Sequence, residues 1–382
     1  MSIQAAIAGI GLVTPLGESA RDTWDALLAG RFIEDHAKVR LEFDRKRSRI
    51  SSLAIRAAAE AAGGSDLTNA ALIIGTSKGP VEEWLAPPSR LSDVGGSIRL
   101  GLASVAADVA TEFCIGGPRL TLSAACASGL HALIRGAMLI HSGQVSRVLV
   151  VACEASVCPL FLASFARLGV LPPAGWGCRP FDRSRAGFLM SEAAAAVLLV
   201  ADDRGADVAV ERYAIGADAT HLTGMDLQGR TLRHVLGSAL NQSPVDLIHA
   251  HGTGTELNDE IELAALDDLV EDGVRPAVYS HKAALGHSLG AAGLVSVVLN
   301  VLSHRTGVVP PNVRTDDPLP TRRLSICRNP VRRNIARSIA IAAGFGGAIA
   351  AVTLRSTNGA EPVSKAGGSR AAPPPDALIN GM

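Results

Sequence analysis

The sequence contains few aromatic residues and no excess charge of either sign. Phenylalanine, tyrosine and tryptophan make up 3% of its 382 residues, which argues against a surface on which nucleic-acid bases could stack. Lysine and arginine together number 36, and so do aspartate and glutamate, so the formal net charge is zero. A protein without net charge has no general electrostatic attraction to nucleic acid or to an anionic membrane. We therefore expect neither as a partner.

Cysteine pairs and long apolar runs are missing as well. None of the six cysteines lies in a Cys-x-x-Cys pair, and a chain of this length needs no disulfide bonds to hold its core together. The apolar runs have the length of a strand and are too short to span a membrane. The first eight residues lack the basic stretch of a signal peptide. These absences predict a cytoplasmic protein with reduced thiols and no membrane span.

The sequence does contain short β-rich apolar runs that alternate with longer alanine-rich segments. Hydrophobic residues make up 48%, enough for a sizeable core. The alternation is typical of an α/β protein whose strands are buried on both faces. Strands are expected at Gln4–Ile10, Ala70–Ile74, Leu120–Ser123, Arg147–Ala152, Ala193–Val200, Val208–Gly216, Leu247–Ala250, Ala277–Ser280, Ser338–Ala343 and Ile349–Arg355. Helices are expected at Ala20–Leu28, Ile50–Ala62, Ser128–His141, Asp259–Leu269 and Ala291–Leu302.

Two similar halves are expected, 1–204 and 205–356, divided at a polar segment around residue 204. In each half a strand ends at a turn and a helix follows, with Cys126 at the first turn and His251 at the second. We interpret these two units as a duplication. From residue 357 to 382 the composition changes to glycine, proline, serine and alanine, which predicts a disordered tail.

Cys126 lies where a predicted strand meets a predicted helix. Its small neighbours, Ala125 and Ala127 among them, leave room for a substrate to approach. A thiol in the first turn of a helix lies at the positive end of the helix dipole, which favours the thiolate by roughly 0.5–1 kcal/mol. A buried packing cysteine is the alternative for any single cysteine in an apolar stretch. Cys126 is thus a candidate nucleophile.

The motif His-Ala-His-Gly-Thr-Gly-Thr ends another predicted strand. His251 could face a cleft there, and Thr253 and Thr255 could hydrogen-bond a polar ligand arm. His249 and His251 are two residues apart, so an extended strand would place both on one face. A third metal ligand is not apparent nearby, and we therefore expect no metal site.

Two further motifs lie towards the C-terminus. In His-Lys-Ala-Ala-Leu-Gly-His, Lys282 and His287 stand five residues apart, ahead of a run of small residues that could open a closely packed helix. Gly-Phe-Gly-Gly, residues 344–347, lies between two predicted strands as a tight turn whose amides could face a cleft. Taken alone, the first motif could be a structural helix start and the second a plain hairpin. Together, a thiol, two histidines, a lysine and a glycine-rich turn suggest acyl transfer.

These ordered motifs resemble the β-ketoacyl-acyl-carrier-protein synthases of the thiolase superfamily, particularly the type II fatty-acid synthases and polyketide ketosynthases. The resemblance runs from Gly9 to about Arg355. It implies the thiolase fold, an α/β architecture in which a duplicated unit forms two five-stranded mixed sheets between layers of helices. It also implies a homodimer, or a heterodimer with a second ketosynthase-like subunit, in which the strand after the nucleophile helix pairs across the two-fold axis.

The resemblance also implies catalytic roles. Cys126 is expected to take the acyl chain from a carrier thioester. His251 and His287 are expected to drive decarboxylation of a malonyl extender and to stabilise its enolate oxygen. Lys282 is expected to organise the histidines and the charge around them, and the acidic pair Asp259 and Glu262 follows the first histidine motif.

Binding roles follow by the same resemblance. The backbone amides of Cys126 and Phe345 are expected to form an oxyanion hole, and the Phe345 ring to act as a mobile gate. Thr253 and Thr255 are expected to hydrogen-bond the phosphopantetheine arm of an acyl carrier protein, which is the expected partner. The enzyme would need no cofactor of its own.

Departures from the family pattern leave two alternatives open. Ser191–Ala195 replaces a glycine-rich motif, Ala343 replaces an aromatic residue, and Ser296 stands where an acidic partner of the lysine is common. The alternatives are a non-elongating acyltransferase or a thiolase-like enzyme that uses the same thiol, and a non-catalytic partner subunit of the chain-length-factor type. A basic cluster after Pro320, together with Lys78, could meet an acidic carrier protein or could be an ordinary solvated surface.

Overall fold

The computed structural model describes residues 4–42, 47–85, 101–202 and 206–357. The strands are β1 (Ala5–Val13), β2 (Ala71–Gly75), β3 (Arg119–Leu122), β4 (Arg147–Glu154), β5 (Ala193–Val200), β6 (Val208–Ala217), β7 (Leu247–His249), β8 (Ala277–Tyr279), β9 (Val308–Val309), β10 (Ser325–Ile326), β11 (Val331–Arg332), β12 (Arg337–Ala343) and β13 (Ala348–Ser356). The helices are α1 (Ala20–Leu28), α2 (Arg49–Ala62), α3 (Val81–Trp84), α5 (Ala103–Glu112), α6 (Ser128–His141), α7 (Pro159–Arg167), α8 (Arg230–Leu240), α9 (Glu256–Leu269), α10 (Lys282–Leu285) and α11 (Ala292–Thr306), with a short 3₁₀ helix, η1 (Leu289–Ala291).

The large sheet repeats one topology twice. Its first half has the order β3-β2-β4-β5-β1 and its second half the order β8-β7-β12-β13-β6. In both halves the first three strands are parallel and the last two are antiparallel to their neighbours. The halves meet where β1 pairs with β6 over three residues, and β10 extends the second half beyond β8. The expected duplicated α/β fold is confirmed, with its two sheets joined edge to edge.

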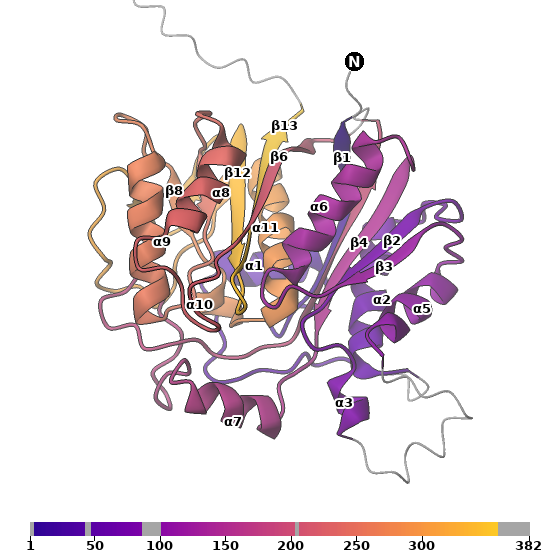
Figure 1. Cartoon of the computed structure of the whole chain (residues 1–382), viewed down its shortest axis with the longest axis horizontal. Helices are drawn as coiled ribbons and strands as arrows, with labels where there is room; N and C mark the ends of the chain where they lie inside the picture. Colours follow the sequence, from indigo (N-terminus) through magenta and orange to yellow (C-terminus); the bar gives the residue numbers. More distant parts are fainter. Residues whose placement is uncertain (1–3, 43–46, 86–100, 203–205, 358–382) are drawn as a thin grey trace, which may run out of the picture.

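Five layers result from this repeat. Helices α6 and α11 lie between the two halves and share one apolar core with the facing sides of both. The outer face of the first half is covered by α2 and α5, and that of the second half by α8 and α9 (Figure 1). The two central helices approach closely because glycine faces the contact, since a Cβ on Gly129 would lie 2.8 Å from the amide nitrogen of Leu294. On the other side of the contact, a Cβ on Gly293 would lie 2.8 Å from Leu130 Cγ, which confirms the close packing expected of the small-residue run that opens α11.

The internal repeat matches different units from those expected. Cys126 follows β3, whose counterpart in the second half is β8, and β8 is followed by Lys282 and His287. His251 instead follows β7, the counterpart of β2. The expected match of the Cys126 turn with the His251 turn was therefore wrong, because strand order in the sheet cannot be read from two similar strand–turn–helix units.

All ten expected strands and all five expected helices are present, with ends shifted by a few residues. Helices α5, α7 and α8 were not expected. None of the three has a side chain that caps its first turn, although α7 does begin with a proline, Pro159. The proposed boundary near residue 204 and the tail from residue 358 lie outside the described residues.

The expected dimer contact also needs correction. The strand after the nucleophile helix is β4, and it is hydrogen-bonded to β2 on one edge and to β5 on the other. A strand with both edges occupied cannot pair with a second molecule. Within the described part of the chain, β3 is paired only with β2. The other edge of β3 is therefore the edge at this end of the sheet that could pair with a second molecule.

Over the described ranges, no helix is both long enough and apolar enough to cross a lipid bilayer.

Candidate active site

One pocket of about 220 Å³ brings together most of the residues singled out from the sequence. Cys126 enters it from the turn before α6, His251 from the loop after β7, and His287 from the segment after α10. Phe345 enters from the turn between β12 and β13. The pocket is also lined by Ser77, Lys78, Ala125, Phe165, Val170, Phe188, Thr223, Gly224, Met225, Thr253, Thr255, Leu257, Asn258, Leu289, Ala343 and Gly344.

Cys126 lies just before α6 and not within its first turn. The helix begins at Ser128, and the amides of Ala127 and Ser128 already donate to the carbonyls of Ala124 and Ala125. Burial raises the pKa of the Cys126 thiol to about 11, while the positive charges of Lys282 and Lys78 act in the opposite direction. Desolvation thus acts against the expected preference for thiolate and outweighs the two nearby cations.

His251 and His287 lie face to edge within the pocket. Their ring centroids are 5.6 Å apart, with the ring planes at 81°. Phe188 packs its ring edge-to-face against His287, with centroids 4.9 Å apart. Burial, followed by the charge of Lys282, lowers the pKa of both imidazoles well below the usual value. Both rings are therefore neutral near pH 7, and each can donate one N–H to a substrate oxygen.

Two buried carboxylates shape the loop that carries His251. Glu262 accepts hydrogen bonds from the amides of His251 at 2.6 Å and Gly252 at 2.7 Å. Asp259 accepts from the amides of Gly254 and Phe181. Gly252 and Gly254 have positive φ angles of 41° and 75°, a conformation that side chains disfavour. The acidic pair noticed in the sequence thus holds the loop from within α9 and does not reach the pocket.

Lys282 does not line the pocket. Its ammonium group is buried and donates to the backbone carbonyl of His251, while Ser280 donates from its hydroxyl to the carbonyl of Gly252 at 2.8 Å. Burial lowers the pKa of Lys282, and the carboxylate of Glu262 is the largest charge that opposes this. Burial has the opposite effect on the acid and raises the pKa of Glu262 to about 7. Among the nearby charges, that of Glu262 therefore contributes most to keeping the lysine protonated.

The turn at residues 344–347 lies against the backbone of Cys126. A Cβ on Gly344 would be 2.8 Å from the carbonyl oxygen of Ala124 and 3.0 Å from the amide nitrogen of Cys126. Over the described ranges, neither the Cys126 amide nor the Phe345 amide donates a hydrogen bond to the protein. Two unused amides beside one thiol provide the donor pair that an oxyanion hole needs.

Replacing Gly344 by alanine is expected to lower turnover by roughly 10²–10³-fold, the usual effect of losing one oxyanion donor. The added methyl group would push the turn away from Ala124 and with it the Phe345 amide. Steady-state kinetics and a thermal melt would measure this. Gly346→Ala is a matched control for a changed turn residue, because its added methyl group would have no atom within 4 Å, although its positive φ of 80° costs stability. Equal turnover in both variants would contradict the assignment.

Thr253 and Thr255 line the pocket side by side, with their hydroxyl oxygens 2.8 Å apart. Thr223, Gly224 and Met225 also line the pocket, and the sequence patterns did not reveal them. These residues belong to a loop without regular periodicity, so no local pattern could have placed them here. The apolar part of the pocket, with Phe165, Phe188 and Leu289, was also missed, because its members come from three separate segments.

His249 does not share a site with His251. Its Nδ1 and Nε2 atoms lie 3.0 Å from Asn300 Oδ1 and 2.9 Å from His281 Nδ1, inside the protein and away from the pocket. Among the residues that the structure describes, no three metal-binding side chains form a group.

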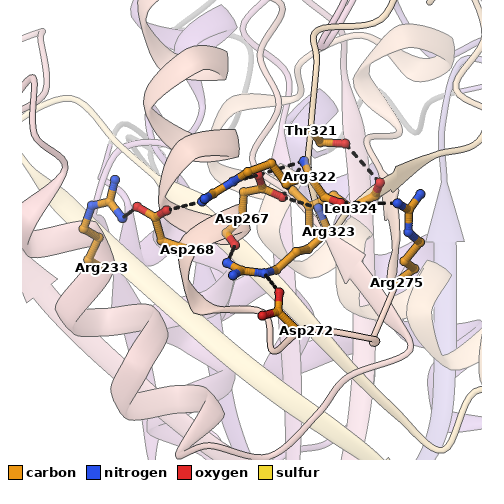
Figure 2. Close-up of polar contacts among 9 residues, drawn as sticks. All are labelled: Arg233, Asp267, Asp268, Asp272, Arg275, Thr321, Arg322, Arg323 and Leu324. Carbon is orange, nitrogen blue, oxygen red and sulfur yellow. Dashed lines mark hydrogen bonds and ion pairs between the residues drawn. The ribbon is translucent and has the colours of Figure 1, made fainter.

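Four of the six arginines in the cluster after Pro320 form ion pairs within the chain; the six are Arg322, Arg323, Arg328, Arg332, Arg333 and Arg337. Arg322 contacts Asp267 and Asp268 at the end of α9, and Arg323 contacts Asp272 (Figure 2). Arg337 forms a two-point ion pair with Glu211. Because most of this charge is already paired, the cluster is a poor candidate for a carrier-protein surface. Lys78, in contrast, lies at the pocket, 5.3 Å from the Phe161 ring centroid.

Solved ketosynthases have the same fold. The ishigamide ketosynthase/chain length factor matches with a TM-score of 0.82 and 25% identity, over 93% of this chain and 99% of that one. The models of the β-ketoacyl synthase N-terminal domain and C-terminal domain match residues 46–204 and 208–316. The chain belongs to the β-ketoacyl synthase family, whose members are acyltransferases.

Curated relatives come from two branches of this family. A putative polyketide β-ketoacyl synthase 1 from Streptomyces halstedii is 31% identical, over 93% of this chain and 98% of that protein. A 3-oxoacyl-[acyl-carrier-protein] synthase 2 from Mycobacterium leprae (strain TN) is 30% identical, over 80% of this chain and 85% of that protein.

Proposed function

We propose that this protein elongates a carrier-bound acyl chain by decarboxylative Claisen condensation on Cys126. The observation that carries the proposal is a single pocket that joins one thiol, two neutral imidazoles and two unused backbone amides. Each of these groups has a task in the reaction, and the pocket leaves room for a substrate between them.

The first half-reaction is acyl transfer. The Cys126 sulfur attacks the acyl carbonyl of a carrier thioester, and the carrier thiol leaves with the proton that the Cys126 thiol gives up. The carbonyl oxygen carries negative charge in the tetrahedral intermediate, and the amides of Cys126 and Phe345 donate to it. Thr253 and Thr255 bind the phosphopantetheine arm that delivers the thioester, and the Phe345 ring gates the passage of the chain.

The second half-reaction is carbon–carbon bond formation. A malonyl-carrier thioester binds with its carbonyl oxygen between His251 and His287, and loss of CO₂ leaves an enolate whose oxygen accepts both N–H groups. The enolate carbon attacks the acyl-Cys126 carbonyl, the Cys126 sulfur leaves as a thiolate and takes a proton from solvent, and the product is a β-ketoacyl-carrier thioester. Neutral imidazoles suit this step, because hydrogen-bond donation stabilises the enolate oxygen without the desolvation cost of two buried cations.

The alternatives are disfavoured by particular residues. A non-catalytic partner subunit has no need of a thiol in the pocket with two histidines. A thiolase-type enzyme generally uses two cysteines, and Cys126 is the one cysteine among the described pocket residues. A non-elongating acyltransferase shares the first half-reaction and would differ by leaving malonyl-carrier unchanged.

The partner and the assembly are part of the same proposal. An acyl carrier protein would present the acyl and malonyl groups, and a second ketosynthase-like chain, identical or not, would complete a dimer at the free edge of β3. Solved relatives include a ketosynthase in complex with its chain length factor, which supports a heterodimer as one form. A cytoplasmic location, halves at 1–204 and 205–356 and the absence of an intrinsic cofactor remain predictions.

The test is a condensation assay with a purified acyl carrier protein loaded with acetyl to dodecanoyl groups and with malonyl. We expect intact-protein mass spectrometry to find one acyl group on the enzyme, peptide mapping to place it on Cys126, and malonyl-carrier to be converted to a β-ketoacyl product. Acylation without condensation would point to the transferase. No acylation by any donor, alone or with a partner subunit, would disprove the proposal.

The raised pKa of Cys126 predicts a pH dependence. The thiol ionises only near pH 11, so the alkylation rate with iodoacetamide should rise about tenfold per pH unit from pH 7 to 10 without a plateau. Cys114 is exposed and serves as an internal control for the reagent. A plateau of the Cys126 rate below pH 8 would show instead that the helix end and the lysines do lower its pKa.

A further inference from the structure

Beneath the pocket lies a buried cluster of polar side chains that the proposed reaction does not use. His249 ends β7, His281 immediately precedes α10, and Asn300 and Ser296 lie on α11. All four are at most 1% exposed, and none lines the pocket. Burying this many polar groups is costly unless their hydrogen bonds are satisfied, so the cluster calls for a reason.

The hydrogen bonds of the cluster form a chain with one direction. Asn300 donates from Nδ2 to the carbonyl of Ile339 at 3.4 Å, so its Oδ1 faces His249 and accepts from Nδ1. A neutral imidazole has one donor and one acceptor, so His249 Nε2 accepts from His281 Nδ1 at 2.9 Å. Burial lowers the pKa of His249 to about 3 and that of His281 well below its usual value, which keeps both rings neutral.

The position of the pair connects it to the site. The last backbone hydrogen bond between the β7 and β8 segments runs from the amide of Ala250 to the carbonyl of Tyr279. Beyond it, the hydrogen bonds between the two segments all involve a side chain. His249 stands two residues before His251, and His281 stands one residue before Lys282. The bond between the two imidazoles therefore links the same two segments as the bond from Lys282 to the carbonyl of His251.

Histidine suits this position because it bridges without charge. His249 uses both ring nitrogens, towards Asn300 and towards His281, whereas His281 uses Nδ1 and its buried Nε2 has no partner among the described residues. The two ring centroids lie 5.1 Å apart. Ser296 lies 3.5 Å from His281 Nδ1 and brings no charge either. A carboxylate at this position would add a second negative charge near Lys282, whereas the neutral pair leaves Glu262 as the largest charge that favours its protonated form.

From this geometry we infer that His249 and His281 are positioning residues of the condensing site. Their mutual hydrogen bond, anchored on Asn300, fixes the distance between the segments that carry His251 and Lys282, and thereby aims the His251 imidazole at the substrate oxygen. This inference rests on the proposed function, because it assigns the pair to the same half-reaction. A single lost bond then misplaces His251 without removing any group from the pocket.

Replacing His281 by leucine tests this inference in the full-length enzyme with malonyl-carrier protein. We expect kcat for CO₂ release to fall by about 10–100-fold with KM nearly unchanged, because a displacement of the order of 1 Å costs up to 10² in rate. Acylation of Cys126 by acyl-carrier protein should stay close to the wild-type rate. His249→Leu removes the same bond and also its anchor on Asn300, so it should cost at least as much as His281→Leu. The double variant should lose no more than His249→Leu, since the bond between the two rings is already absent from that single variant.

Conservative replacement and a remote histidine provide the controls. His249→Gln keeps a donor for Asn300 and an acceptor for His281, so it should restore most of the decarboxylation rate, whereas His249→Met should not. His304 is buried and bridges the hydroxyls of Ser338 and Ser356 at 2.9 Å each, far along α11. His304→Leu should lower the melting temperature and leave kcat unchanged.

Two failures can be told apart. If the wild-type enzyme neither acylates Cys126 nor releases CO₂, the proposed function fails. If the wild-type enzyme does both, and His281→Leu only melts earlier as His304→Leu does, the pair is a packing feature and the inference fails. Should the leucine variants not fold, the comparison of His249→Gln with His249→Met decides, and equal kcat in those two overturns the inference.

Discussion

Replacing Cys126 by alanine should abolish covalent acylation of the enzyme and with it all condensation. No other thiol lines the pocket among the described residues, so no second nucleophile can take over. The measurement is the mass of the intact protein after incubation with acyl-carrier thioesters, together with the yield of β-ketoacyl product. The loss should be complete, because the reaction must pass through the acyl-enzyme, and no acyl-enzyme can form without the thiol.

The control for this variant is Cys327→Ala, which removes a half-buried thiol beyond β10 and outside the pocket. It should retain the wild-type mass shift and product yield. The alanine variant at position 126 should also keep its fold, because the change trims one sulfur beside an existing cavity. Acylation that persists in Cys126→Ala would move the nucleophile elsewhere and remove the basis of the proposed mechanism.

Replacing His287 by alanine should separate the two half-reactions. Decarboxylation of malonyl-carrier should fall by roughly 10²–10³-fold, about 3 kcal/mol of transition-state stabilisation, since one of two donors to the enolate oxygen is lost. Acylation of Cys126 should persist, because its oxyanion is served by backbone amides that the substitution leaves in place. The matched measurements are CO₂ release and the acyl-enzyme mass for the same preparation.

His234→Ala is the matched control, because it removes an exposed imidazole from α8 and changes no pocket residue. Its two rates should equal those of the wild type. If His287→Ala lost acylation and decarboxylation together, His287 would act in the first half-reaction, and the division of labour between imidazoles and amides would be wrong. If it lost neither, the enolate would be stabilised by other groups.

Local sequence patterns predicted the helices, strands and tight turns of this chain well. The spacing of apolar residues along the chain differs between helices and strands, which is why strands such as β4 and helices such as α6 lie close to their expected bounds. The glycines of the 344–347 turn and of the loop after β7 mark tight backbone, and both segments do lie at the pocket. These features depend on neighbours within a few residues, and a sequence displays such neighbours directly.

Other features depended on segments far apart in the chain. Arg322 and Asp267 form an ion pair across 55 residues, and Arg337 and Glu211 do so across 126, so a basic cluster in the sequence is not a basic surface on the protein. The Cys126 thiol meets the charge of Lys282 only after folding, and its ionisation is set by the water that the assembled pocket excludes. Neither the ion pairs between distant residues nor the ionisation of the Cys126 thiol can be read from the sequence.

The order of motifs along the chain by itself determined the family, the duplicated fold and the identity of the thiol and the two pocket histidines. Only the tertiary structure decided that Lys282 and Glu262 act on the backbone of His251, that Cys126 is held as a neutral thiol, and that His249 and His281 join beneath the site. The reason is physical: residue type and spacing set what a segment can form, whereas desolvation and long-range hydrogen bonds exist only once the segments have packed together.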